Sequence, residues 1–178
     1  MLSEELQRLE LLTFENVSKQ LEKVRDMFLF ACYTGLRYSD VSGLTINHFN
    51  ETEKGLRLNK AAQKTSKILD LPLGLLFGGK PENLIRKYWS DNPKTKLFGF
   101  TNQFVNRELK TLSKQAGIKK HLTFHVARHT AATILSKKVG VWETKNLLQH
   151  SKLETTNQYL HSSQIELDRS LSEVTNWY

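Results

Sequence analysis

Only one stretch of this sequence alternates in the manner of β-strands, and helical patterns flank it on both sides. The segments LTINHF, GLRLNK and KILDLPL lie between residues 44 and 73 and mix alternation with β-branched or aliphatic side chains. The turn-rich segment NETEK separates the first two, so together they predict a small three-stranded antiparallel sheet. Elsewhere apolar residues recur at helical spacing, which predicts helices over residues 3–11, 15–34, 39–44, 81–90, 102–116, 124–138, 141–148 and 155–161. The predicted fold class is therefore mainly α with one small antiparallel sheet (α+β).

The composition is typical of a soluble globular protein and favours a polyanionic partner. Of the 178 residues, 39% are hydrophobic and 25% are charged, and the net charge is +8. A small basic domain favours a partner such as nucleic acid. The single cysteine, Cys32, excludes an internal disulfide and fits a reducing compartment. No apolar run approaches the ~18 residues of a membrane span, and the acidic start is unlike a signal peptide. We therefore expect one cytoplasmic domain that spans no membrane.

The segment FHVARHTAATIL, residues 124–135, places two histidines and an arginine inside a predicted core helix. Thr123 is the predicted N-cap, and Phe124 begins the apolar stripe that packs on the core. His125 and Arg128, at i and i+3, share an adjacent face. Because arginine is almost never fully buried without a partner, either this face is a solvated edge or its polar residues face something that needs them.

Two familiar site patterns fail on inspection. His121, His125 and His129 are spaced by four, but an N-cap at Thr123 leaves His121 outside the helix, and no acidic residue completes an HExxH pattern. A metal site is therefore not expected. LFGGKPEN resembles part of a phosphate-binding loop, yet it lacks the first glycine and the hydroxyl residue after the lysine. A surface turn before a helix that starts with proline is the better interpretation.

Two arginines have the chemistry for a phosphate pocket. Arg37 follows TGL just after a predicted helix end at Gly35, and Arg128 lies beside His125. Either arginine alone is more often a salt-bridge residue. Together with histidines and a tyrosine, however, their planar and permanently charged forks fit phosphate oxygens in pairs.

Three motifs in this order resemble those of the tyrosine recombinase, or phage-integrase, family: TGLRYSDVSGL, HVARHT and LLQHSKLETTNQYLH. The segment NKAAQKTSKILDLPL resembles the hairpin of that family that carries a catalytic lysine. The match runs from about residue 4 to residue 165, and its style is closest to the integrases of mobile elements. The resemblance carries six catalytic residues over to this chain: Arg37, Lys64, His125, Arg128, His150 and Tyr159.

Some assignments have alternatives. Lys60 and Lys67 compete with Lys64 for the role of the hairpin lysine. His129 follows HxxR in many members, where it is usually a structural hydrogen-bonding residue. The remaining candidate tyrosines lack the motif context and are expected to pack or to lie on the surface: Tyr33, Tyr38 and Tyr178.

The resemblance implies cleavage and rejoining of DNA without metal, ATP or other cofactor. Tyr159 would attack a phosphodiester to form a 3′-phosphotyrosine link, and the arginines would stabilise the charge on the phosphate. Lys64 would protonate the leaving 5′-oxygen, and His125 would accept the proton of the tyrosine. Two alternatives remain: a type IB topoisomerase-like enzyme that nicks and reseals DNA, and a catalytically idle DNA-binding module with the same fold.

The chain also departs from the family pattern. Gln149 stands before His150 where the family usually has glycine at a helix C′ position, which predicts slight strain in that turn. Residues 1–178 are interpreted as a single catalytic domain, with the N-terminal core-binding domain of the family absent. The resemblance implies double-stranded DNA and other protomers as partners, with a tetramer on DNA and a monomer when free. The amphipathic tail, residues 162–178, would then pack on its own domain or be exchanged between protomers.

Overall fold

The computed structural model describes residues 3–13 and 18–149. The helices in these ranges are α1 (Ser3–Glu10), α2 (Lys19–Thr34), α3 (Tyr38–Ser42), α4 (Lys80–Lys87), α5 (Asn102–Gln115), α6 (Phe124–Lys138) and α7 (Val141–Leu148). The strands are β1 (Phe49–Thr52), β2 (Gly55–Ala61) and β3 (Ile68–Pro72), and short 3₁₀ helices cover Ile46–His48 and Leu73–Gly79. The predicted fold class, mainly α with a three-stranded antiparallel sheet, is confirmed.

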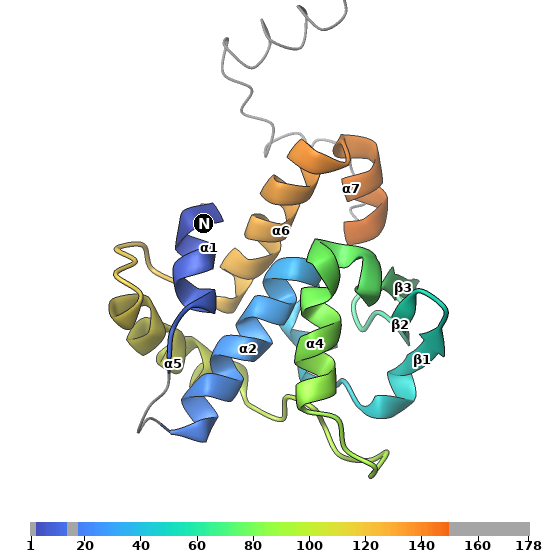
Figure 1. Ribbon diagram of the computed structural model, residues 1–178, viewed down its shortest axis with the longest axis horizontal. Helices are drawn as coiled ribbons and strands as arrows, with labels where there is room; N and C mark the ends of the chain where they lie inside the picture. Colours follow the sequence, from blue (N-terminus) through green and yellow to red (C-terminus); the bar gives the residue numbers. More distant parts are fainter. Residues whose placement is uncertain (1–2, 14–17, 150–178) are drawn as a thin grey trace, which may run out of the picture.

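Helix α2 forms the centre of the fold. Figure 1 shows it in the middle of the molecule, with α1, α4, α5 and α6 around it and the sheet on one side. Its side chains are buried around most of its circumference, and Phe28, Phe30 and Met27 are fully buried. The stretch from Asp26 to Thr34 is buried at every position, so other elements must enclose this half of the helix. The end of α2 is therefore held firmly by packing, and the segment with Arg37 follows directly from it.

The sheet has the order β1–β2–β3, with both pairs antiparallel. The prediction that residues 44–49 form the first strand is wrong. The Thr45 amide donates to Nδ1 of His48 at 3.1 Å, and a 3₁₀ turn covers Ile46–His48 in the middle of that segment. Strand β1 begins only at Phe49 and takes in most of the predicted turn, and Thr52 pairs with Gly55 across a two-residue loop. Local bonds from side chain to backbone thus override the strand propensity of this segment.

Helix ends follow the local signals in most places. Gly35 closes α2 in the left-handed conformation, with φ 68°. Thr101 caps α5 by accepting a hydrogen bond from the Phe104 amide. Thr123 occupies the N-cap position of α6 as predicted, but its side chain makes no capping bond. Instead Asn106 of α5 accepts from the Phe124 amide at 2.8 Å, so a neighbouring helix supplies the cap.

Other boundaries also bear on the predictions. Helix α7 covers the predicted residues 141–148, whereas α4 begins one residue early and ends at Lys87. The helix predicted over residues 155–161 and the tail, residues 162–178, lie outside the described residues. No helix in the described part of the chain is both long and apolar enough to cross a lipid bilayer.

Candidate active site

Arg37 projects from the turn between α2 and α3. It occupies the N-cap position of α3 in an extended conformation, with φ −73° and ψ 156°, and its side chain is half-buried. Within the described residues its guanidinium makes no hydrogen bond or ion pair. Donors that the described residues leave unused suit an anionic ligand, because arginine N–H groups fit phosphate oxygens.

Arg128 is held quite differently. It is only 8% exposed, and its guanidinium donates to two main-chain carbonyls: Nη1 to Gly35 at 2.8 Å and Nη2 to Leu148. Gly35 lies two residues before Arg37, and Leu148 lies two residues before His150. A buried arginine needs a partner, and the partners here include backbone carbonyls of the segment before Arg37 and of the end of α7. Arg128 joins them to α6.

The packing around Gly35 brings these segments close. A Cβ atom added to Gly35 would lie 2.0 Å from Cδ2 of Leu148 and 3.3 Å from Cβ of Ala131. Two properties of glycine are needed here: it adopts a positive φ without strain, and it has no Cβ to clash with Leu148. The end of α2, the middle of α6 and the end of α7 therefore meet at one point beside Arg37.

His125 lies one turn before His129 on α6 and is exposed. The two rings meet edge to face with centroids 4.4 Å apart. Burial lowers the pKa of His129, and the nearby His125 and Arg128 act in the same direction. The fold thus favours the neutral form of His129. His121 precedes the helix as predicted, and the described residues contain no group of three or more potential ligands that could hold a metal.

Lys64 lies in the exposed loop between β2 and β3, where the sequence predicted it. Asp40 of α3 fixes one side of this loop: its Oδ1 accepts from the Gln63 amide at 2.9 Å. The Asp40 carbonyl also accepts from Nζ of Lys60 at 2.9 Å. Lys60 is thus engaged with the backbone, and burial lowers its pKa although Asp40 opposes the shift. Lys67 lies in the same exposed loop.

Gln149 ends α7 in the left-handed conformation, with φ 55° and ψ 42°, as its alignment with a family glycine predicted. This conformation costs a non-glycine residue about 1 kcal/mol. The side chain makes two hydrogen bonds to the β2–β3 loop: Nε2 donates to the Ile68 carbonyl at 2.7 Å, and Oε1 accepts from the Thr65 hydroxyl at 3.3 Å. The strained turn is therefore tied to the Lys64 loop.

Hydrogen bonds thus connect all the described motif segments in a ring. Arg128 joins α6 to the Arg37 turn and to the end of α7, Gln149 joins α7 to the Lys64 loop, and Asp40 joins that loop back to α3. His150 and Tyr159 lie outside the described residues, so their positions stay predictions.

Three tyrosines in the described part of the chain are committed to other contacts. The Tyr33 hydroxyl donates to Glu10, the Tyr38 hydroxyl to the Phe100 carbonyl, and the Tyr88 hydroxyl to Asp26, at 2.7, 2.7 and 2.8 Å. Burial and the carboxylate partner raise the pKa values of Tyr33 and Tyr88. All three hydroxyls are thus occupied by contacts within the fold.

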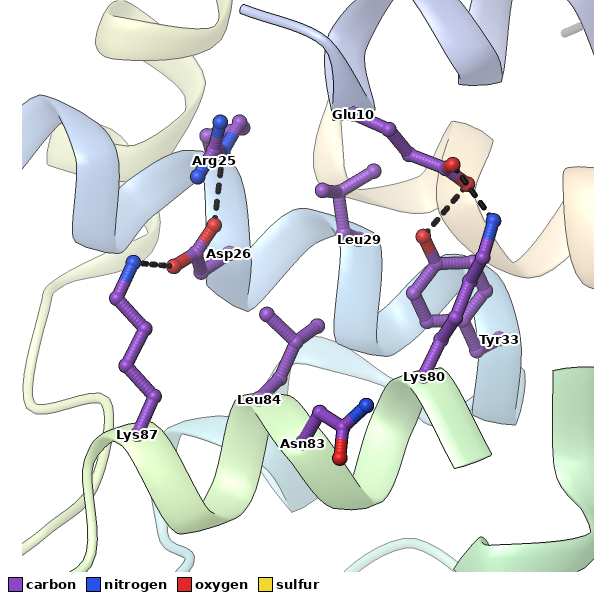
Figure 2. Close-up of a pocket in the computed structure, with 9 residues that line it drawn as sticks. All are labelled: Glu10, Arg25, Asp26, Leu29, Tyr33, Lys80, Asn83, Leu84 and Lys87. Carbon is purple, nitrogen blue, oxygen red and sulfur yellow. Dashed lines mark hydrogen bonds and ion pairs between the residues drawn. The ribbon is translucent and has the colours of Figure 1, made fainter. Parts of the chain in front are cut away.

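A separate pocket of about 250 Å³ lies among α1, α2 and α4 (Figure 2). Its charged groups are paired within the pocket. Glu10 accepts from Lys80 and Tyr33, and buried Asp26 accepts from Lys87 and Arg25. None of the predicted catalytic residues lines it. This network fastens α1 and α4 to the central helix.

The sequence prediction missed two residues that hold the site together. Asp40 lies in the motif TGLRYSDVSGL, but the motif predicts no role for it. Its only local signal is its place three residues after Arg37. Gln149 was noted only as a source of strain. The contacts of both residues depend on the distant hairpin loop, which the local sequence pattern does not place.

A model described as the phage integrase family matches residues 2–166 of this chain. A tyrosine recombinase of Pseudothermotoga lettingae is 30% identical over 166 residues, which cover 90% of this chain and 55% of that protein. The tyrosine recombinase XerC of Haemophilus influenzae is 29% identical over 157 residues, covering 82% and 52% respectively. The chain thus spans about half the length of the curated relatives it matches.

Solved structures share the fold. The XerH site-specific recombinase, in a pre-cleavage complex with its difH substrate, matches 95% of this chain and 51% of its own, with a TM-score of 0.69 and 18% identity. A lambda integrase tetramer bound to a Holliday junction matches 89% of this chain and 47% of its own, with a TM-score of 0.69 and 17% identity. With the family model covering nearly the whole sequence, the chain belongs to the phage integrase family of tyrosine recombinases.

Proposed function

We propose that this chain is the catalytic part of a site-specific DNA recombinase that cuts and rejoins strands through a 3′-phosphotyrosine link. The observation that carries the proposal is the pair of hydrogen bonds that Arg128 donates to the Gly35 and Leu148 carbonyls. These two bonds hold the turn that carries Arg37 close to the end of α7, the helix that precedes His150 in the sequence. Those segments supply the cations and hydrogen-bond donors that a phosphoryl-transfer site needs.

The chemistry follows from these groups. The Tyr159 oxygen bonds to phosphorus, the bond from phosphorus to the 5′-oxygen breaks, and Lys64 gives that oxygen a proton. His125 accepts the tyrosine proton, His150 donates a hydrogen bond to the phosphate, and Arg37 and Arg128 stabilise the charge on its non-bridging oxygens. Religation is the same sequence in reverse, so no ATP is required. The commitment of Tyr33, Tyr38 and Tyr88 to other partners supports Tyr159 as the nucleophile.

The partners follow from the same reasoning. The net charge of +8 favours a polyanion, and the XerH and lambda integrase structures are complexes with DNA. We therefore propose double-stranded DNA as the substrate. The lambda integrase tetramer on a Holliday junction supports assembly of this chain with other protomers on DNA, and we propose that it is monomeric when free.

A covalent-capture experiment tests the function. The chain is incubated with nicked duplexes of random flanking sequence. After cleavage the short fragment with the 5′-hydroxyl diffuses away, so religation cannot occur and the phosphotyrosine link is trapped. We expect a denaturant-resistant adduct with the unmodified chain and with Tyr38→Phe, but none with Tyr159→Phe. An adduct that persists in Tyr159→Phe contradicts the assignment of the nucleophile. Absence of any adduct, also with a longer protein that includes this chain, contradicts the proposed function.

Relaxation of a supercoiled plasmid separates the recombinase from a topoisomerase-like enzyme. A recombinase of this type is expected to act only on plasmids that carry the sequences enriched by covalent capture. Rapid relaxation of plasmids without those sequences would favour the nick-and-reseal alternative.

A further inference from the structure

The side chain of Gln149 spans the base of the loop that carries Lys64. Its Nε2 donates to the Ile68 carbonyl at 2.7 Å and its Oε1 accepts from the Thr65 hydroxyl at 3.3 Å. Thr65 directly follows Lys64, and Ile68 is the first residue of β3, an edge strand of the sheet. One amide group thus contacts both the tip and the return strand of the loop. A glycine at this position, with no side chain, would leave both contacts unmade.

The loop has few other supports. Residues 63–68 are all exposed. Inside the loop the Ala62 amide donates to the Lys67 carbonyl and the Ser66 amide to the Ala62 carbonyl, both at 2.9 Å. From outside, Asp40 accepts from the Gln63 amide. An exposed loop with few buried contacts opens readily, so the two bonds from Gln149 form a large share of what fixes the side that follows Lys64.

The Lys64 ammonium itself makes no hydrogen bond or ion pair with the residues that the structure describes. Its position therefore depends on the loop backbone rather than on its own contacts. Asp40 holds the residue before it, and Gln149 holds the residue after it. Gln149 also directly precedes His150, so the same residue connects the lysine loop to the histidine segment.

We propose that Gln149 is a positioning residue for the proton-transfer step. Its amide holds the Lys64 loop against the end of α7, so that the Lys64 ammonium is in place to protonate the leaving 5′-oxygen. In that step the Tyr159 oxygen bonds to phosphorus as the bond to the 5′-oxygen breaks, the Lys64 proton moves to that oxygen, and His125 takes the tyrosine proton. The inference rests on the proposed function, because it assigns Lys64 as the acid.

Two variants of the full chain separate the hydrogen bonds from the backbone strain. Gln149→Gly removes the bonds and also the strain of the left-handed conformation, whereas Gln149→Met keeps the length and the strain but cannot make the bonds. Gln149→Gly should therefore be the more stable of the two. We expect amide hydrogen exchange over residues 63–68 to be about tenfold faster in both variants, from the loss of two modest hydrogen bonds.

The chemical test uses DNA in which sulfur replaces the bridging 5′-oxygen. A thiolate leaves without a proton, because a thiol is far more acidic than an alcohol, so this substrate bypasses the general acid. Both variants should cleave the ordinary substrate roughly ten- to a hundredfold more slowly, part of the ~10²–10⁴ that general acid catalysis contributes. They should cleave the sulfur-bridged substrate at nearly the unmodified rate.

The possible outcomes are distinct. Unchanged exchange of residues 63–68 in both variants overturns the proposed hold on the loop. Equal slowing on the two substrates also overturns the proposal, because it would assign Gln149 a general structural role instead. If neither the unmodified chain nor a longer protein that includes it forms an adduct with either substrate, the proposed function fails, and the exchange rates still decide whether Gln149 fixes the loop.

Discussion

Replacement of Arg128 should destabilise this protein far more than replacement of Arg37, although both arginines are assigned to the same phosphate. Arg128 is 8% exposed and donates to the Gly35 and Leu148 carbonyls. Each bond from a charged donor is worth about 1.5–3 kcal/mol. Arg128→Ala loses both bonds and leaves two acceptors without their donor, so we expect a loss of about 4 kcal/mol.

Arg128→Lys supplies an intermediate case. A lysine keeps the charge, but its single ammonium cannot span two carbonyls as a planar guanidinium does. We therefore expect a loss of about 2 kcal/mol, which corresponds to one bond. Arg37→Ala is the matched control: its guanidinium makes no hydrogen bond or ion pair with the described residues, and the loss should stay below about 1 kcal/mol.

Urea denaturation followed by circular dichroism measures these differences. With a slope near 2 kcal/mol per molar urea, Arg128→Ala should lower the midpoint by roughly 2 M and Arg37→Ala by less than about 0.5 M. Covalent adduct formation should be lost in both alanine variants. Similar midpoints for the two alanine variants would refute the reasoning, because Arg128 would then hold no more structure together than Arg37 does.

Three further outcomes follow from the contacts. Gly35→Ala should cost about 2–4 kcal/mol from a positive φ and a crowded Cβ, whereas Gly78→Ala, with φ 65° but nothing within 4 Å, should cost only about 1 kcal/mol, as denaturant midpoints can show. Asn106→Ala should cost about 1 kcal/mol by uncapping α6, and Thr123→Ala, whose side chain makes no capping bond, should cost clearly less; equal losses would contradict this. Because the pKa of His129 is lowered on folding, its contribution to stability should be complete above pH ~6.5 and be lost as the pH falls below that value, and a histidine NMR titration that shows no lowered pKa would contradict it.

The sequence predicted those features that depend on neighbouring residues. Gly35 ends α2 because its left-handed conformation is a local requirement, and Thr101 caps α5 through an amide three residues on. The boundaries of α6 agree with the prediction for the same reason. Where two local preferences competed, at Thr45 and His48, the strand pattern was misleading and a turn formed.

The remaining features depend on residues far apart in the chain, which no local pattern encodes. Asn106 caps a helix that begins 18 residues later, and Gln149 contacts a loop more than 80 residues earlier. The resemblance predicted that Gln149 would be left-handed, which is confirmed, but counted it only as strain. The structure shows two side-chain bonds that offset that strain.

The contrast between the two arginines gives a physical reason for the arrangement of the site. Arg37 is half-buried on the turn between α2 and α3 and makes no hydrogen bond or ion pair with the described residues, so the fold depends little on its side chain. Arg128 occupies a buried position on α6, where its charge would be costly without partners, and the carbonyls of Gly35 and Leu148 repay that cost. Because those carbonyls belong to the turn before Arg37 and to the end of α7, the burial of one cation fixes where these two segments lie relative to α6. A substitution at Arg128 is therefore expected to loosen the packing of these two segments as well as to remove a positive charge.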